Sequence, residues 1–157
     1  MPARHKPNTK RCRFFRAMII SVLPAMLLWQ ALAGGQNDKS KFKNEFKNRL
    51  YNFTLKLIEF IDKLPNDNVS RRIGDQLLRS GTSILGNYIE GKSASSKKDF
   101  TNFFNHSLKS SNESKLWLAI LRDSGRADNK KADWFLKELD EISKIFGSSI
   151  LTLKGKK

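Results

Sequence analysis

The stretch GDQLLRSGTSILGNYIEG, residues 74–91, decides the fold of this chain. Its apolar residues recur at helical spacing, and Ile84 and Tyr88, four residues apart, lie on one face of a helix. Gly81 and Gly86 nevertheless sit inside that helix, where each glycine destabilises it by roughly 1 kcal/mol relative to alanine. Small residues at these positions let a helix approach a partner closely, so the stretch predicts a tightly packed bundle of helices.

Three more segments of the chain have the period of an amphipathic helix. Large apolar residues alternate in steps of four and three through residues 42–64, and this pattern stops before Pro65. Similar stripes run through residues 100–121 and 135–153, and no segment from residue 41 onward has the period of a strand. Four amphipathic helices joined by short loops lie antiparallel to their neighbours, which predicts an all-α, up-down-up-down four-helix bundle.

Two of the predicted helices begin with a capping signal. Asn68 follows the turn after the first helix and is the predicted N-cap of the second. Ser96 and Asp99 have the spacing of a capping box at the start of the third helix. The predicted core stripes include Phe42, Val69, Leu116 and Ile120.

Residues 1–40 differ in composition from the rest of the chain. A basic segment is followed by the almost wholly apolar AMIISVLPAMLLWQALA, residues 17–33, which at this length and with Pro24 is short for a membrane span. This order matches a secretory signal, and an upstream extension from a misplaced start codon has the same composition, so both interpretations stay open. We expect residues 1–40 to be an N-terminal extension outside the fold, and residues 41–157 to be the bundle domain.

The composition favours a polyanionic partner and gives little support to catalysis. The 157 residues include 30 Lys and Arg against 15 Asp and Glu, a formal net charge of +15. Such an excess suggests nucleic acid or an anionic membrane surface, and a basic face kept for solubility has the same composition. Cys12 is the single cysteine, and with His5 and His106 as the two histidines no zinc-ligand spacing exists. No glycine-rich phosphate loop or nucleophile elbow occurs either, so we expect no enzyme, no cofactor and no metal site.

Several separated segments resemble one protein family in order and spacing. They are FKNRLYNFTLKLIEFIDKLP (residues 46–65), IGDQLLRSGTSILGNYIEGKSASSKKDF (73–100), ESKLWL (113–118) and LRDSG (121–125). These segments resemble the four-helix-bundle proteins encoded in intervening sequences of bacterial 23S ribosomal RNA genes. The likeness covers about residues 42–157, and residues 1–40 have no counterpart in the family.

The resemblance implies a small basic bundle that assembles as a ring-like homopentamer, with no enzymatic activity attached to it. It also implies a relation to the accessory proteins of diversity-generating retroelements, which bind nucleic acid and a reverse transcriptase. The partners expected on this basis are further copies of the chain, nucleic acid with RNA favoured, and a reverse transcriptase or another protein. The resemblance further implies a cytoplasmic protein whose bundle does not associate with a membrane.

The predicted topology gathers positive charge at one end of the bundle. The start of the first helix, the loop between the second and third, and the C-terminus share that end. This lysine-rich end carries nine lysines: Lys41, Lys43, Lys47, Lys92, Lys97, Lys98, Lys154, Lys156 and Lys157. Against the acidic Glu45, Glu90 and Asp99 its net charge is about +6, whereas seven basic and six acidic residues leave the opposite end at about +1. Arg71 and Arg72 at the opposite end are a secondary basic candidate.

Polar residues beside the apolar stripes suggest contacts inside the bundle. Asn87, Glu90 and Glu113 are predicted to form a buried polar network or a subunit interface. No Glu-x-x-His motif occurs in the chain, so the carboxylates do not match a di-iron bundle. Asp75 and Arg79, spaced four residues apart with the acid first, are predicted to form an ion pair.

Two functional hypotheses follow from these patterns. The first is a non-enzymatic oligomer that binds RNA or DNA through its lysine-rich end, with little sequence specificity because lysines contact phosphates. This hypothesis rests on lysines alone, since Trp117 and Trp134 at helical spacing are expected to be core residues. The alternative is a protein–protein scaffold or accessory subunit whose charge is incidental, because Lys92 and Lys154 also complement helix dipoles.

Overall fold

The computed structural model describes residues 38–155, which form four helices and no strand. The helices are α2 (Asp38–Ile61), α3 (Asn68–Lys92), α4 (Lys97–Asp123) and α5 (Asn129–Leu153). The chain divides into two units, Met1–Phe42 and Lys43–Lys157, and the second unit contains the bundle. Residues 1–37, most of the predicted N-terminal extension, lie outside the described residues.

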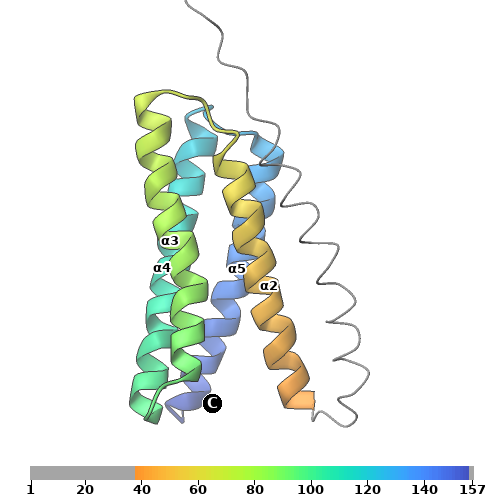
Figure 1. Cartoon of the computed structure of the whole chain (residues 1–157), viewed down its shortest axis with the longest axis vertical. Coiled ribbons are helices and arrows are strands. Elements are labelled where there is room, and N and C mark those ends of the chain that lie inside the picture. The colour runs from red at the N-terminus through yellow and green to blue at the C-terminus, as the bar shows by residue number, and fades with distance from the viewer. Residues whose placement is uncertain (1–37, 156–157) are drawn as a thin grey trace, which may run out of the picture. The chain divides into compact units, whose positions relative to one another are not determined.

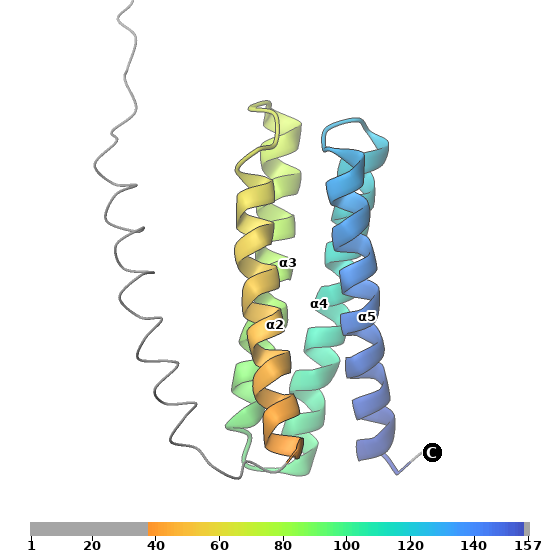
Figure 2. The same cartoon turned by 90° about the vertical axis from the view of Figure 1, so that its right-hand side faces the viewer.

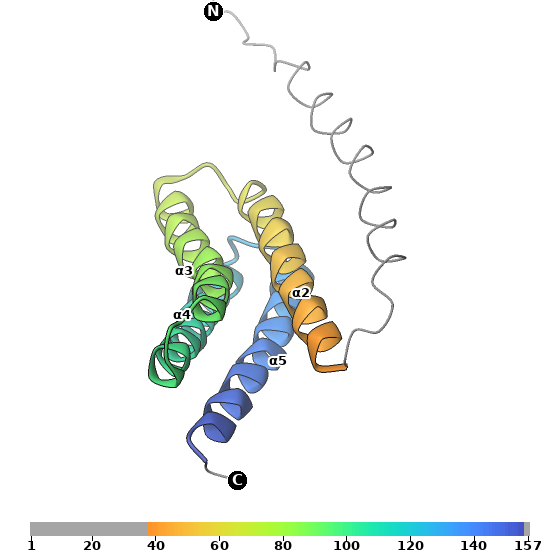
Figure 3. The ribbon, with the colours of Figure 1, turned by 60° about the horizontal axis from the view of Figure 1, so that its bottom comes forward.

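Each helix runs antiparallel to the one before it (Figure 1). The α2–α3 and α4–α5 loops lie at one end, and the α3–α4 loop and the end of α5 lie at the other. Figure 2 shows α2 beside α3 and α4 beside α5. Buried side chains from all four helices, which Figure 3 shows from a third direction, form one hydrophobic core. The predicted four-helix bundle and its up-down-up-down order are confirmed.

The helix starts are capped by side chains, although not always by the predicted one. Asp67 rather than Asn68 caps α3, because its carboxylate accepts hydrogen bonds from the amides of Val69 and Ser70 at 2.9 and 3.0 Å. Ser96 caps α4 as predicted, with its hydroxyl oxygen 3.1 Å from the donating Asp99 amide. The Asp99 carboxylate accepts from the Ser96 hydroxyl instead of from its backbone amide.

Aromatic side chains fill the core between α2 and the other helices. Phe46 of α2 meets Tyr88 and Phe146 edge to face, with ring centroids 5.3 and 5.5 Å apart. Further along the bundle, Phe53 packs in the same way on Phe135. The backbone of α4 approaches α3 and α5 along much of its length, whereas α2 stands farther off and is bridged by these large rings.

Buried serines explain why α3 and α4 approach so closely. The Ser80 and Ser114 hydroxyl oxygens lie 2.8 Å apart across the contact, and the Ser107 hydroxyl donates to the Ile84 carbonyl at 3.2 Å. Ser111 is also fully buried and donates to the Ser107 carbonyl within α4. Hydrogen bonding satisfies each hydroxyl, so the small side chains bring the backbones together without leaving a buried polar group unpaired.

Only some of the small residues of α3 serve the predicted close packing. A Cβ added to Gly81 would overlap the buried Leu57 side chain of α2, so glycine is needed for that contact. Gly91 has the same role against Phe103 of α4, a Cβ there lying 3.2 Å from the Phe103 Cβ. The prediction is wrong for Gly86, because no described atom outside α3 lies within 4 Å of the corresponding position.

An ionic fork holds the outer side of α2 to α5. Arg49 Nε and Nη2 donate to the two carboxylate oxygens of Glu138 at 2.6 and 2.9 Å, and Nη2 also reaches Glu141. The Glu138 hydrogen bond raises the pKa of Arg49, and the Arg49 guanidinium holds the pKa of Glu141 below its usual value. Five predicted core residues are instead exposed: Phe42, Val69, Leu116, Ile120 and Trp134.

Gly81 and Gly86 offer a matched test of the packing on one helix. Gly81→Ala should lower the free energy of unfolding by about 1 kcal/mol, because overpacking Leu57 costs ~1–3 kcal/mol and outweighs the ~1 kcal/mol gain in helix propensity. Gly86→Ala has only the propensity gain and should raise the free energy of unfolding by about 0.5–1 kcal/mol. Denaturant titration followed by circular dichroism measures both, and a Gly81→Ala variant more stable than the parent would contradict the packing.

Candidate nucleic-acid interface

Short connections bring lysines from several helices to one end of the bundle. Lys92 is the last residue of α3, and Lys97 and Lys98 are the first two of α4, so the α3–α4 loop joins them directly. Lys154 follows α5 at the same end, where α2 begins (Figure 1). All four side chains are exposed, as phosphate contacts require.

Lys43, Lys47 and Lys92 form the densest part of this surface. Partial burial lowers the pKa of Lys92, and the positive charges of Lys47 and Lys43 lower it further. Like charges act on one another in this way only when the side chains share a neighbourhood. α2 and α3 therefore contribute their lysines to one positive cluster.

Tyr88 fixes the geometry of that cluster. Its buried ring lies under Lys92, with Nζ 5.2 Å from the ring centroid, and its hydroxyl donates to the Lys43 carbonyl at 3.1 Å. Burial also raises the pKa of the Tyr88 phenol, so the hydroxyl remains a hydrogen-bond donor. One core side chain thus ties the end of α3 to the start of α2 and supports Lys92 from below.

Of the three remaining lysines of the lysine-rich end, the structure describes only Lys41. Lys41 is exposed on the first turns of α2, and Lys156 and Lys157 lie outside the described residues.

Arg71 and Arg72 are exposed on the first turn of α3, at the opposite end of the bundle. Arg72 donates to the Asn68 side chain at 3.2 Å, so part of its guanidinium is engaged within its own helix.

Asn87, Glu90 and Glu113 do not form the predicted buried network within the chain. The Asn87 amide donates to the Ser83 carbonyl of its own helix at 2.7 Å, and Glu90 is exposed. Glu113 lies on α4 and accepts from Arg79 of α3 at 2.8 Å. A role of the three residues in a subunit interface stays a prediction.

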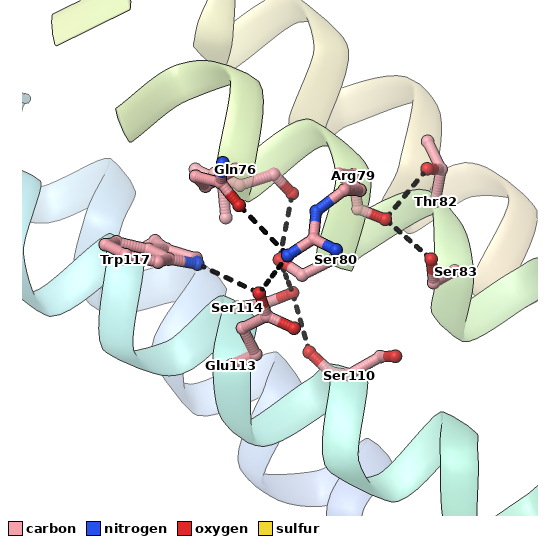
Figure 4. A network of polar contacts seen from close by, with 10 residues as sticks. Gln76, Arg79, Ser80, Thr82, Ser83, Ser110, Glu113, Ser114 and Trp117 are labelled. Atoms are coloured by element: carbon pink, nitrogen blue, oxygen red, sulfur yellow. Dashed lines mark hydrogen bonds and ion pairs between the residues drawn. The ribbon is translucent and has the colours of Figure 1, made fainter. Parts of the chain in front are cut away.

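Figure 4 shows the polar network that joins α3 to α4 instead. Arg79 donates to Gln76 at 3.0 Å and to Glu113 at 2.8 Å, so the predicted pair with Asp75 is wrong. The Ser80–Ser114 contact lies beside this ion pair. In the sequence, serines spaced three and four residues apart in the third predicted helix indicate this contact. The pattern of apolar residues does not reveal it, because serine is polar.

Within residues 38–155, no group of three or more His, Cys, Asp or Glu side chains is arranged to hold a metal ion. In the same part of the chain, no helix has the length and apolar character needed to cross a bilayer.

The fold and this surface define a basic, antiparallel four-helix bundle with lysines gathered at one end. The chain matches the 23S rRNA-intervening sequence protein family over residues 43–148 and belongs to that family, which confirms the resemblance seen in the sequence. The chain is also similar to a crystal structure of a protein of unknown function from the S23 ribosomal protein family of Bacteroides thetaiotaomicron. The two share 31% sequence identity with a TM-score of 0.63, over 66% of this chain and 96% of that one. No curated protein matches the chain.

The positive cluster makes a prediction about Lys92. Replacing Lys43 and Lys47 by glutamine should raise the pKa of Lys92 toward the ordinary 10.5, because nearby positive charges disfavour its protonated form. The pKa of Lys92 should stay below 10.5 in this variant, since burial is the larger cause of its lowering. A pH titration of the Lys92 side-chain NMR signal measures the change. The double variant Lys109→Gln/Lys137→Gln removes the same charge elsewhere and should leave this pKa unchanged; an equal effect of both variants would argue against the cluster.

Proposed function

We propose that the chain is a non-enzymatic, cytoplasmic, oligomeric protein that binds RNA or DNA through its lysine-rich end. The observation that carries the proposal is the positive cluster of Lys43, Lys47 and Lys92. Holding these ammonium groups near one another is unfavourable in the free protein, since the charges of Lys47 and Lys43 add to the effect of burial in lowering the pKa of Lys92. A polyanion that lies across the cluster relieves this repulsion and releases its own counterions.

The chemistry of the cluster favours backbone recognition over sequence reading. Lysine ammonium groups are compact point charges that pair with phosphate, whereas sequence is read by groups that fit base edges. Lys97 and Lys98 extend the surface beyond the cluster, on the first turn of α4. A protein with this surface binds structured RNA or duplex DNA by charge and shape, with a strong dependence on salt.

Assembly of several copies strengthens such binding. In a ring with the bundles roughly parallel to its axis, every copy presents its lysine-rich end on the same face. The exposed apolar residues Tyr51, Leu55 and Ile58 support an interface, since they are spaced four and three apart along one face of α2. The proposed assembly is the homopentamer that the family resemblance implies.

The same apolar face supports the second candidate function, a protein–protein scaffold or accessory subunit. In that case Tyr51, Leu55 and Ile58 contact a different protein, such as a polymerase, and the lysines only keep the surface hydrated. Capture of a protein partner that survives nuclease treatment favours this function over nucleic-acid binding.

The triple variant Lys92→Glu/Lys97→Glu/Lys98→Glu of the full chain tests nucleic-acid binding. Its affinity for a fluorescent structured RNA and for duplex DNA should fall by at least about 100-fold at low salt, and the log–log salt slope should become shallower by about 0.7–0.9 per lost phosphate contact. The control Lys109→Glu/Lys137→Glu/Lys144→Glu makes the same charge change at exposed positions outside the lysine-rich end. Equal losses in both variants would mean that net charge alone drives binding.

Light scattering on the full chain tests the assembly. The parent protein should have five times the mass of one chain, and Leu55→Glu/Ile58→Glu should reduce that mass, because charges on a buried apolar contact are strongly unfavourable. Lys109→Glu/Lys144→Glu adds acidic residues at other exposed positions and should leave the mass unchanged. A monomeric parent protein would contradict the proposed oligomer.

A further inference from the structure

A second basic surface lies between α2 and α5, near the end of the bundle opposite the lysine-rich end. A hollow of about 300 Å³ there is lined by four lysines: Lys56, Lys63, Lys130 and Lys131. Glu59 is the one acidic residue in its lining. The net charge of about +1 expected for this end is a sum over all its faces, so it does not reveal that four lysines gather on one of them.

Four of the acidic residues at this end are engaged elsewhere. Asp123 and Asp133 both bind Arg122, at 2.8 and 2.7 Å. Asp67 and Asp128 accept hydrogen bonds from backbone amides at the starts of α3 and α5. Within residues 38–155, no ion pair engages the four lysines of the hollow, so their charge is available to an anion.

Trp134 gives this hollow a feature that the lysine-rich end lacks. The sequence predicted a core residue, yet the Trp134 side chain is 42% exposed while its neighbour Phe135 is buried. Phe135 supports the indole edge-on, with ring centroids 4.9 Å apart, and with Phe60 completes the apolar part of the lining. Tyr88 at the other end is buried beneath Lys92 and offers no exposed ring.

The helical register places the charges beside the indole. Lys130 and Lys131 precede Trp134 by four and three residues, so all three lie on one face of α5, with Cβ atoms about 5–6 Å apart. Lys56 lies on α2 and Lys63 in the turn that follows α2, and both line the hollow. An exposed aromatic ring that shares a hollow with several lysines matches a nucleotide, whose base and phosphate are separated by one sugar.

We propose that the Trp134 hollow binds an unpaired nucleotide, with the base stacked on the indole and the phosphate held by Lys63, Lys130 and Lys131. Lys56 Nζ covers the indole in the free protein, 4.5 Å from the ring centroid. A stacked base gains more than an exposed cation–π contact does, so it displaces this flexible ammonium, which then adds to the phosphate contacts. Duplex bases are stacked on one another and cannot use the indole, which makes the site selective for single strands or free nucleotides.

This site is independent of the proposed function, because it uses none of the lysines of the lysine-rich end. The test compares binding of a short fluorescein-labelled oligo(U), the same sequence paired in an RNA duplex, and free UMP to the full chain. Trp134→Leu should weaken oligo(U) binding about tenfold and leave duplex binding within about twofold, since stacking on one aromatic residue accounts for a factor of this size. Trp134→Tyr keeps a ring and should retain most of the affinity.

The matched control is Trp117→Leu, which removes an indole of α4 that does not line the hollow. It should leave both affinities unchanged. Lys130→Glu/Lys131→Glu should weaken oligo(U) binding more than Lys109→Glu/Lys137→Glu does. The triple variant of Lys92, Lys97 and Lys98 should lower duplex and single-strand binding alike. The two sets of variants therefore test the lysine-rich end and the hollow separately.

The fluorescence of Trp134 distinguishes the possible occupants. Quenching of tryptophan fluorescence by UMP that is lost in Trp134→Tyr assigns the site to free nucleotides as well as strands, and quenching by oligo(U) alone assigns it to single strands. Equal loss of oligo(U) and duplex binding in Trp134→Leu would overturn the proposal, as would no loss of either. A change of oligomeric mass in Trp134→Leu by light scattering would identify the hollow as a subunit contact and would also overturn it.

Discussion

The close approach of α3 and α4 is the constraint on which the rest of the bundle depends. Ser80, Ser107 and Ser114 are small enough to let the backbones draw together and polar enough to bond across the gap. The backbone of α2 stands farther from the other helices, and phenylalanine rings bridge that distance. The large and small residues are therefore parts of one packing solution, in which the serines set the distances and the aromatic rings fill what remains.

The same geometry sorts the charges of the surface. Antiparallel helices with short connections place the end of α3 beside the start of α4, so Lys92, Lys97 and Lys98 share one end. At the other end, Asp67 and Asp128 satisfy amides that would otherwise lack partners. Acidic side chains thus cap helices or form ion pairs, while many lysines stay exposed. The surface of this basic protein therefore has regions that are strongly positive.

α2 connects the two basic surfaces. Its first turns carry Lys43 and Lys47 beside Tyr88, and its later turns carry Lys56 into the Trp134 hollow, which Lys63 lines from the turn after α2. The two surfaces differ in chemistry, because one presents ammonium groups over a buried ring and the other presents them beside an exposed one. Charge alone suits the phosphates of any nucleic acid, whereas an exposed indole selects bases that are free to stack.

The sequence by itself determined the helices, their order and the family. A period of 3.6 residues is a local property that apolar side chains record directly, as Leu57 and Phe146 do at the centre of their stripes. Topology then followed from loop lengths, and with it the meeting of Lys92 with Lys43 and Lys47. Only the tertiary structure decided which faces are buried. In α4 the buried face carries serines, whereas Leu116 and Ile120 of the predicted apolar stripe are exposed. The tertiary structure also decided that Arg79 pairs with Glu113 and not with Asp75. These outcomes depend on distances between helices, which are set by the sum of many contacts and leave no periodic signal in any one segment.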